Sequence, residues 1–389
     1  MLVEAKGKGK KQVGTHLVGV DIGFGDLKRV SNTFPIPAVI PSAVVPGAKP
    51  ASSKLFELPT IQDDCLVVTT GEGTFFVGNQ AMNIPASGSK RTQVRDRAND
   101  QTSRVLFQTG IALSVPHEEG EYNVFVVTGL PNDDYDLSVR KNLEEFLNNT
   151  FTIEFHLSET RSIKKIINVI GCEVLRQPEG TVTYNQFMFD MEHFLVPSTN
   201  ARTTVGIMDF GHFTTDYALF QEGVIVENES VNGSTVGMTE VYNKLRRKLI
   251  VKFDEMGYEY RATDKDLDNA VRNRVVNYMN QTFDVSVEVD EAAREVAATI
   301  AKAVLDAWGN ETNRLEMIIV SGGGSNVFAP FLQAEFDARK KQGFQEIVAP
   351  QYSNVLGFYM YGCIAQSENF DTDTMFSVYI NPVFNRKAA

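Results

Sequence analysis

The sequence has few cysteines, no excess of positive charge and no long apolar run. Its three cysteines, Cys65, Cys172 and Cys363, are widely spaced and odd in number, and none lies near a histidine at metal-ligand spacing. This usage argues against a disulfide framework and is typical of structural thiols in a reducing cytosol. The sequence contains neither a signal peptide nor an apolar run of about 18 residues, so it indicates no secretion and no membrane span. We therefore expect a cytoplasmic location without membrane partners.

The scarcity of positive charge excludes another class of function. The formal net charge is -12, whereas a protein that binds nucleic acid directly usually has a basic face. The basic cluster from Lys6 to Lys11 is interspersed with glycine and precedes the first strand, which predicts a flexible tail over residues 1–15. The rest of the composition, 43% hydrophobic and 22% charged, is that of a globular protein, and 389 residues are enough for two or more domains.

Two short stretches far apart in the chain have the same pattern. They are VGVDIGFGDLK, from Val18 to Lys28, and VGIMDFGHFTTDYALF, from Val205 to Phe220. Each is an apolar strand that ends in Asp-x-Gly, turns tightly and returns as a second strand, with a carboxylate beside a glycine whose backbone can approach a ligand closely. A third glycine element, IIVSGGGSNVF from Ile318 to Phe328, follows an apolar strand and begins a predicted helix. Together they predict a cleft with two phosphate-binding hairpins and a glycine turn for the rest of a nucleotide.

The residue types in these motifs suit a phosphate ligand with a divalent cation. Asp21 and Asp209 are the candidate metal ligands, which would hold Mg²⁺ between the β- and γ-phosphates, partly through water. Successive backbone N–H groups in the turns form anion-binding nests, and Lys28 adds a point charge. The candidate nucleotide-binding residues are Asp21, Gly23, Phe24, Gly25, Asp26 and Lys28 in the first hairpin, Asp209, Gly211, His212, Thr214 and Thr215 in the second, and Gly322, Gly323 and Gly324 in the glycine turn. One Asp-x-Gly turn alone is common turn chemistry; three glycine elements in this order are a specific signal.

Strands alternate with helices on both sides of the repeated motif, which predicts an α/β fold with two related lobes from an internal duplication. The predicted strands are Cys65–Thr70, Thr74–Asn79, Tyr122–Thr128, Phe151–His156 and Lys165–Cys172. The predicted helices are Gln101–Leu113, a helix capped by Ser138, Thr235–Phe253, Asp264–Met279 and Asp290–Trp308. Residues 87–99 are polar and basic, which favours a loop.

The order and spacing of the three glycine elements resemble those of the actin-like ATPase superfamily, which includes actins, heat-shock chaperone ATPases and sugar kinases. DIGFGDLK and DFGHFTTD resemble its two phosphate motifs, and IIVSGGGSN resembles its adenosine motif. Four further stretches, IPSAVV, FFVGNQA, VVTGLP and SNVLGFYMYG, are similar to the ParM-like (StbA-type) bacterial and archaeal branch. The resemblance covers most of the chain from Thr15 to Gly362 and is weak from about Lys49 to Asn99.

The resemblance implies a duplicated actin-like fold of two α/β domains around a nucleotide cleft, with smaller inserted lobes. The expected first domain is residues 16–200, with an inserted lobe at about 31–100. The expected second domain is residues 201–389, with an outer lobe at about 235–300 and a C-terminal segment that is a candidate to pack back on the first domain.

The resemblance also implies site residues. The family places an acid or an amide near the γ-phosphate after the last strand of the first domain, and we expect Glu179 in QPEG to orient the attacking water, with Gln177 as the alternative. Adenine and ribose contacts are expected from the helix around Asp264 to Asn277, with Arg272 as the candidate, and from the turn Gly323 to Asn326; Arg272 is equally an ordinary solvated helix residue. We interpret His212 as a loop residue rather than a general base.

The function implied by the resemblance is an ATPase with ATP (or GTP) and Mg²⁺ that polymerises into filaments and acts in plasmid or DNA segregation through a DNA-binding adaptor protein. The alternative is a metabolic small-molecule kinase of the same fold. A chaperone ATPase is a less favoured alternative, because it would normally need a substrate-binding domain beyond about residue 380 and the sequence ends at Ala389. A membrane-tethered relative is disfavoured because the sequence from Asp371 onward lacks a basic amphipathic helix.

Overall fold

The structure is a computed structural model of the 389-residue chain. It describes residues 14–366, except residues 49–57, 85–93, 190–194, 227–230, 340–342, 346 and 348. The chain divides into two compact units: unit 1 lies within Met1–Ala201 and Tyr352–Ala389, and unit 2 lies within Arg202–Gln351. The basic cluster of Lys6 to Lys11 lies outside the described residues. Within the described part of the chain, no helix is long and apolar enough to cross a membrane.

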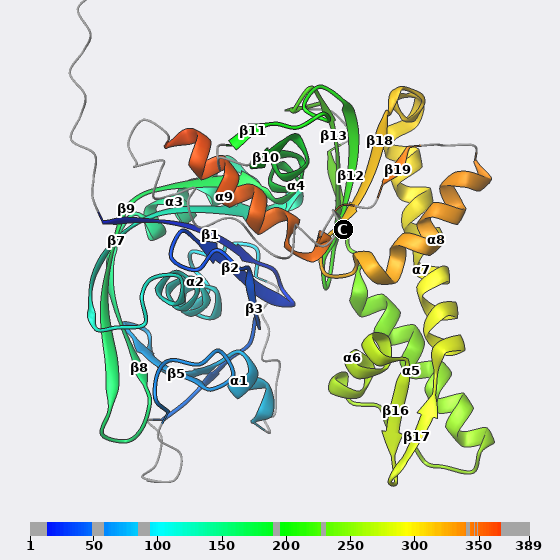
Figure 1. The fold of residues 1–389 in the computed structure, drawn as a ribbon. Coiled ribbons are helices and arrows are strands. Elements are labelled where there is room, and N and C mark those ends of the chain that lie inside the picture. The colour runs from blue at the N-terminus through cyan, green and yellow to red at the C-terminus, as the bar shows by residue number, and fades with distance from the viewer. Residues whose placement is uncertain are drawn as a thin grey trace, which may run out of the picture. The chain divides into compact units, whose positions relative to one another are not determined.

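Unit 1 is built on one large mixed sheet (Figure 1). Within its described residues, nine strands lie in the order β3-β2-β1-β7-β9-β8-β5-β6-β4. The central strands β1, β7 and β9 are parallel, and the strands outside them pair antiparallel. The strands are β1 (Thr15–Ile22), β2 (Asp26–Ser31), β3 (Ala38–Pro41), β4 (Val44–Pro46), β5 (Leu66–Thr70), β6 (Gly73–Val77), β7 (Gly120–Leu130), β8 (Thr150–His156) and β9 (Ser162–Arg176), with a separate pair β10 (Phe187–Phe189) and β11 (Leu195–Pro197).

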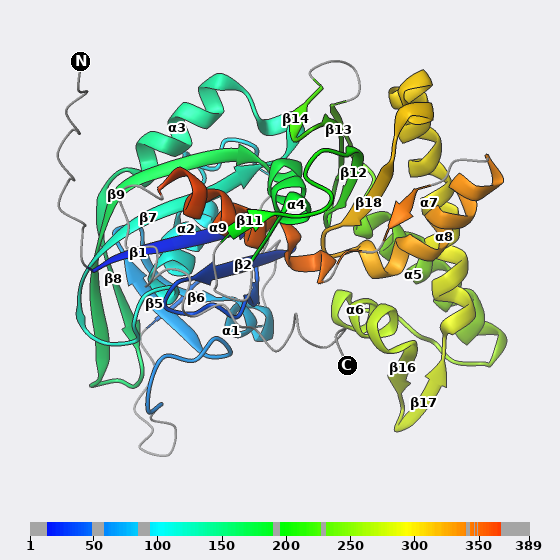
Figure 2. The same cartoon turned by 45° about the horizontal axis from the view of Figure 1, so that its top comes forward.

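Helices cover both faces of this sheet (Figures 1 and 2). Helix α2 covers one face, where Val105 and Leu106 share a core with Val18 and Val20 of β1. Helix α9 covers the other face so closely that a Cβ at Gly19 of β1 would meet the Val355 carbonyl oxygen at 2.8 Å. The helices of unit 1 are α1 (Asn79–Asn83), α2 (Gln101–Leu113), the 3-10 turn η1 (Asn132–Asp134), α3 (Leu137–Leu147), α4 (Gln177–Gln186) and α9 (Ser353–Ala365).

Unit 2 has a smaller sheet with helices that enclose one apolar core. Its described strands lie in the order β14-β13-β12-β18-β19, and β15 also pairs with β13. A separate hairpin is formed by β16 and β17. The strands are β12 (Thr204–Phe210), β13 (Thr215–Gln221), β14 (Val224–Ile225), β15 (Asn232–Ser234), β16 (Val275–Tyr278), β17 (Gln281–Asp284), β18 (Met317–Ser321) and β19 (Phe344–Gln345). The helices are α5 (Met238–Glu255), α6 (Asp264–Asn273), α7 (Ser286–Trp308) and α8 (Ser325–Ala338), with the 3-10 turns η2 (Gly309–Arg314) and η3 (Pro350–Tyr352). The last residue of η3, Tyr352, is the first residue of the second segment of unit 1.

The two sheets repeat one topology. In unit 1 the antiparallel hairpin β1-β2 is followed by a crossover to β7, which lies parallel to β1 on its other side. In unit 2 the hairpin β12-β13 is followed by a longer crossover to β18, which lies parallel to β12 on its other side. This shared order confirms the predicted duplicated α/β fold.

Most predicted elements are present, and helix α2 has the predicted bounds. The prediction of a helix over Asp264–Met279 is wrong in its second half. Helix α6 ends at Asn273, because Arg274 takes a left-handed φ of 62° and the β-branched residues Val275 and Val276 continue as a strand. Met279 and Asn280, with φ of 48° and 61°, then form the tight turn of the β16-β17 hairpin.

Three predicted helix starts also differ from the structure. The cap of α3 is Asp136, not Ser138: its Oδ1 accepts a hydrogen bond from the Ser138 backbone N–H at 2.7 Å. Helix α7 begins at Ser286, four residues before the predicted Asp290; the Ser286 backbone N–H donates to Oδ1 of Asp284 at 2.8 Å. Helix α5 begins at Met238 rather than at Thr235.

Candidate functional site

The first hairpin turn is held by its own backbone and by a neighbouring strand end. The Gly23 N–H donates to the Asp26 carbonyl oxygen at 2.9 Å, which closes the turn between β1 and β2. The Ser42 N–H donates to the Gly25 carbonyl oxygen, also at 2.9 Å. The turn is therefore fixed in shape at the carboxyl end of β1, the end of a parallel strand at which ligands commonly bind.

Asp21 lies one residue before the end of β1 and is only 2% exposed. Its Oδ1 accepts a hydrogen bond from Nε2 of Gln177 at 2.8 Å, and its Oδ2 lies 3.4 Å from Nζ of Lys28. Lys28 faces Asp21 directly across the hairpin. The structure thus pairs the predicted metal ligand with the predicted phosphate-binding lysine, and it brings Gln177 to Asp21 from 156 positions away in the sequence.

Glu179 and Gln177 have different surroundings, although both belong to the first turn of α4. The Glu179 carboxylate accepts a hydrogen bond from the Arg176 backbone N–H at 2.6 Å, in a capping box that closes the start of its own helix. The Gln177 side chain is 7% exposed and contacts Asp21. Both residues therefore lie in a helix that directly follows the end of β9.

The second hairpin has the same closed turn. The Gly211 N–H donates to the Thr214 carbonyl oxygen at 2.8 Å. The carbonyl oxygens of Gly211 and His212 accept hydrogen bonds from the backbone N–H groups of Met238 and Thr239, at 3.2 and 2.8 Å. The start of helix α5 is thereby attached to this turn. The His212 ring lies against the rings of Phe213 and Tyr242.

Two carboxylates face each other across the second hairpin. Asp209 pairs in register with Asp216, so their side chains emerge on the same face of the sheet, and they are 5% and 3% exposed. The Ser321 hydroxyl at the end of β18 donates to Oδ1 of Asp209 at 3.2 Å. The sequence reasoning missed Asp216, although its place seven residues after Asp209, as Lys28 follows Asp21, marks it as the facing residue.

The two predicted threonines of this hairpin differ. The Thr215 hydroxyl is buried and donates to the Val236 carbonyl oxygen at 2.8 Å, which gives it a structural contact. The Thr214 hydroxyl lies in the turn, 3.5 Å from Oδ2 of Asp216.

The glycine turn lies directly beside Asp209. Gly322 has a φ of +84°, and a Cβ there would lie 2.3 Å from Oδ1 of Asp209, so only glycine fits. The Gly324 N–H donates to the Phe210 carbonyl oxygen at 3.0 Å. Gly323 and Asn326 remain exposed at the start of helix α8, where a helix N-terminus favours an anion or a polar ligand group.

Arg272 is an exposed residue of helix α6. Its Nε lies 2.9 Å from Oδ2 of Asp268, four residues earlier, and its side chain is 66% exposed. This i to i+4 ion pair is ordinary helix-surface geometry.

Unit 1 thus gathers Asp21, Lys28 and Gln177, and unit 2 gathers Asp209, Asp216 and the Gly322 turn. In the described ranges, no group of three or more histidine, cysteine, aspartate or glutamate side chains has the arrangement of a complete metal site. A divalent cation held at either hairpin would take its remaining ligands from water or phosphate oxygens, as Mg²⁺ commonly does.

A repeated strand-turn-strand unit with a terminal carboxylate, followed by a glycine turn, defines a two-domain α/β protein of the actin-like class. Two family models match the sequence: the N-terminal domain of actin-like proteins over residues 19–180, and the C-terminal domain of the archaeal MreB-like actin homologue over residues 207–334. Together the two models match well over half of the chain, and each includes one of the two Asp-x-Gly turns. The chain belongs to the actin-like proteins.

Solved structures with the same fold cover nearly the whole chain. A 15-stranded ParM filament from Clostridium botulinum has a TM-score of 0.71 and 20% identity, and the match covers 90% of this chain and 99% of that one. The actin-like protein Alp7A has a TM-score of 0.72 and 15% identity, with 90% and 97% covered. The archaeal actin homologue Ta0583 in complex with ADP has a TM-score of 0.67 and 18% identity, with 89% and 98% covered. A comparison with curated proteins found no match.

Proposed function

We propose that this protein binds a nucleoside triphosphate, ATP or GTP, together with Mg²⁺ and hydrolyses it. The repeated hairpin is the observation that carries the proposal. Two closed turns, each at the carboxyl end of a buried strand and beside a buried carboxylate, are suited to phosphate and to a cation bound with it. The exposed turn at Gly323 and Asn326 is the candidate contact for the base and ribose, with Arg272 as a further candidate.

Magnesium fits the donor set of the hairpins. The facing carboxylates of Asp209 and Asp216 are hard oxygen ligands, and two buried like charges across a hairpin favour a bound cation. Asp21 would contribute from the first hairpin. When bound, the ion would neutralise charge that develops on the phosphate oxygens.

Gln177 is the residue whose contacts best suit the positioning of water. Its Nε2 donates to Asp21, which fixes the amide plane and directs Oε1 elsewhere as an acceptor for a water proton. Phosphoryl transfer depends on such positioning more than on covalent chemistry. The Glu179 carboxylate, which the sequence favours, caps the start of helix α4. We therefore propose that Gln177 orients the attacking water and that Glu179 maintains the helix start that presents it.

Paired variants separate these two roles. We expect Gln177→Ala to lower the turnover of ATP at least ~10-fold, the low end for a positioned catalytic group, with little change in nucleotide affinity. We expect Glu179→Ala to lower the thermal stability of the protein by removing a cap, worth ~0.5–2 kcal/mol, with a smaller effect on turnover. If Glu179→Ala lowers turnover ~10-fold or more while Gln177→Ala leaves it unchanged, the role returns to Glu179. If the folded wild-type protein shows no magnesium-dependent hydrolysis of ATP or GTP, the proposed activity is wrong.

We further propose that the nucleotide state controls assembly into filaments. The support is family membership and the similarity in fold to a protein solved as a ParM filament. A ligand can shift assembly only through different contacts in two states, and the loss of the γ-phosphate supplies such a difference. In this proposal the protein acts in the cytoplasm in the segregation of a plasmid or other DNA, through an adaptor protein that binds the DNA itself.

A small-molecule kinase is the alternative function of this fold class. It predicts a monomer that consumes ATP faster when an acceptor is present and that phosphorylates the acceptor. The filament proposal predicts hydrolysis that rises with protein concentration because assembly stimulates it. The dependence of turnover on protein concentration therefore separates the two.

A further inference from the structure

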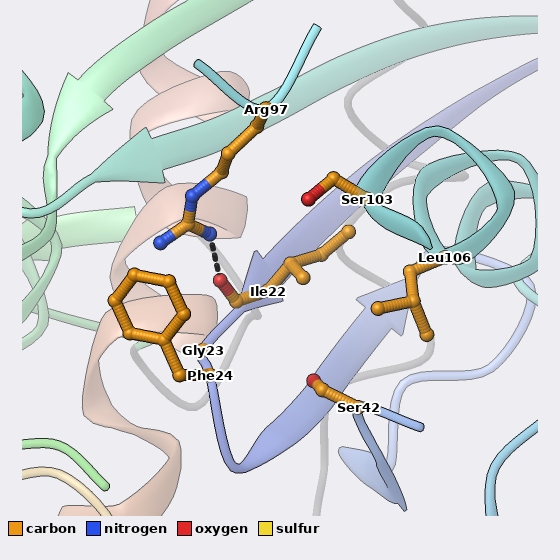
Figure 3. Close-up of a pocket in the computed structure, with 7 residues that line it drawn as sticks. All are labelled: Ile22, Gly23, Phe24, Ser42, Arg97, Ser103 and Leu106. Atoms are coloured by element: carbon orange, nitrogen blue, oxygen red, sulfur yellow. Dashed lines mark hydrogen bonds between the residues drawn. The ribbon is translucent and has the colours of Figure 1, made fainter. Parts of the chain in front are cut away.

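A buried arginine lies beside the turn of the first phosphate hairpin (Figure 3). Arg97 belongs to residues 94–100, the described segment that leads into helix α2, and it is 2% exposed. Burial of a guanidinium is unfavourable unless its charge and its N–H groups are compensated. The position of Arg97 in the core of unit 1 therefore calls for a specific role.

Two contacts of Arg97 fall on the turn between β1 and β2. Its Nη1 donates to the carbonyl oxygen of Ile22, the last residue of β1. Its guanidinium carbon lies 5.0 Å from the centre of the Phe24 ring, within the range of a cation–π contact. Arg97 thus contacts the residues on both sides of Gly23.

These contacts fix one peptide plane of the phosphate turn. The Ile22 carbonyl and the Gly23 N–H belong to the same planar peptide group and point in opposite directions. The carbonyl accepts from Arg97, and the N–H donates to the Asp26 carbonyl oxygen. Without Arg97 that peptide would keep only one of its two anchors.

The hollow around Arg97 is too small to be the binding site of a phosphate. It is lined by Ile22, Gly23, Phe24, Ser42, Arg97, Ser103 and Leu106, and the space inside it is about 10 Å³. That is about one water-sized sphere, well below the size of a phosphate group. A phosphate therefore does not fit in this hollow, and the two contacts of Arg97 described above act on the turn itself.

A carboxyl group that follows β7 lies close enough to Arg97 for their charges to interact. Asp134, in the turn η1 that follows β7, is 4% exposed and forms an ion pair with Arg95 at 3.4 Å. Burial raises the pKa of Asp134, while the nearby charges of Arg97 and Arg95 act to lower it. The segment with Arg95 and Arg97 thus links the end of β7 to the phosphate turn that follows the neighbouring strand β1.

We propose that Arg97 is a positioning residue that holds the first phosphate turn in its nucleotide-binding shape. The inference rests on the proposed function for its link to nucleotide, and on the described contacts alone for its effect on the turn. Removal of Arg97 should loosen the turn before any ligand is present and should then weaken the binding of the nucleotide phosphates.

The test compares hydrogen exchange of Arg97→Met and Arg95→Met in the full chain without nucleotide. Arg95 is a matched control because it lies in the same segment and carries the same charge, but its side chain is 64% exposed. In Arg97→Met we expect the peptide over residues 19–27 to exchange about 10-fold faster, since loss of a charged hydrogen bond allows local opening. The peptide over residues 124–130 should be unchanged. Arg95→Met should exchange like the wild type at both. Arg97→Lys keeps the positive charge but not the planar guanidinium, so its exchange rate over residues 19–27 should lie between those of the wild type and Arg97→Met. If Arg97→Met does not fold, Arg97→Lys takes its place in the test.

Nucleotide affinity, measured by titration with Mg²⁺-ADP, completes the test. We expect the Kd to rise about 10-fold for Arg97→Met, because a loosened turn must be ordered when the nucleotide binds, and less than about 2-fold for Arg95→Met. Unchanged exchange at residues 19–27 in the folded Arg97 variants overturns the proposal, and so does faster exchange with unchanged affinity. If the wild-type protein binds no nucleotide, the proposed function fails, while the exchange result still decides whether Arg97 holds the turn.

Discussion

The two hairpins share their backbone and differ in their charges. In each, the first glycine N–H donates to a carbonyl oxygen three residues ahead, at 2.9 Å from Gly23 and 2.8 Å from Gly211. Across the first hairpin, however, Asp21 faces Lys28, whereas across the second Asp209 faces Asp216. The duplicated motif has thus kept the turn that suits phosphate and has changed the residue opposite the carboxylate.

This difference predicts different roles for the two carboxylates. Asp21 is held within a buried ion pair and a glutamine contact, so it contributes to the stability of unit 1 before any ligand binds. Asp209 and Asp216 place two like charges on one face of a hairpin, an arrangement that favours a cation. We therefore propose that the first carboxylate mainly stabilises unit 1 and that the second mainly binds the metal.

The largest expected effect is on folding, from Asp21→Ala. This variant leaves Lys28 as a buried charge without its carboxylate, which costs about 3–5 kcal/mol in the free energy of unfolding. Chemical denaturation measures the loss. The double variant Asp21→Ala with Lys28→Met should recover most of it, because no buried charge remains. If the double variant is as unstable as the single one, the ion pair is not the source of the effect.

The next effect is on catalysis, from Asp209→Asn. We expect magnesium-dependent hydrolysis to fall about 100-fold, since one ligand charge of the metal is removed. A variant that hydrolyses nucleotide at the wild-type rate while folded would remove Asp209 from the site.

The sequence alone predicted much of the fold because its strongest signals are local. The Asp-x-Gly turns, the glycine turn and the periodicity of Gln101–Leu113 all lie within short windows, and the structure contains each of them. The end of helix α6 was missed because a left-handed residue at Arg274 has no sequence signal as clear as glycine.

The contacts of the site were harder to predict because they join distant segments. Gln177 reaches Asp21 only because β9 lies beyond β7 in the same parallel set as β1. The sequence offered Gln177 and Glu179 two positions apart, and nothing local showed that the carboxylate of Glu179 would turn back to its own helix start. Arg97 was not considered, because its partner Ile22 is an apolar residue that contributes only a backbone carbonyl.

Lys165 is a second buried lysine of unit 1, and its contacts differ from those of Lys28. Lys28 faces the carboxylate of Asp21, whereas Lys165 contacts backbone carbonyl oxygens. Lys165 of β9 is fully buried, and its Nζ donates to the carbonyl oxygens of Ala112 and Val115. Burial, together with the charge of Arg29, lowers the pKa of Lys165 to about 7. The neighbouring imidazoles of His16 and His117 have lowered pKa values as well, first through burial and then through the charge of Lys165.

The pKa of Lys165 predicts a pH dependence of stability. Above pH 7 the folded state loses this proton, while the unfolded state keeps it up to the usual lysine value of 10.5. The unfolded state then binds more protons, so this group makes stability rise with pH, by up to ~1.4 kcal/mol per pH unit. Between pH 7 and pH 9, the free energy of unfolding of the wild type should therefore rise relative to that of Lys165→Met. Parallel curves for the two proteins would contradict the lowered pKa.

The smallest expected effect concerns Thr215 in the second hairpin. Thr215→Val removes the donor to the Val236 carbonyl oxygen and should lower stability by about 1 kcal/mol. Nucleotide affinity should stay within about 2-fold, because the hydroxyl is engaged inside unit 2. A larger loss of affinity at unchanged stability would assign this hydroxyl to the phosphates, as the sequence motif alone suggests. Melting curves and nucleotide titration on the same preparation distinguish the two results.

Sedimentation after addition of nucleotide and Mg²⁺, with electron microscopy of the pellet, tests the central claim most directly. The wild-type protein should move into the pellet as filaments with ATP or GTP and Mg²⁺, and should remain in the supernatant in a chelator. Asp209→Asn should remain in the supernatant under both conditions. A wild-type protein that stays monomeric at every nucleotide and protein concentration, while it transfers phosphate to a small-molecule acceptor, would contradict the account and establish the kinase instead.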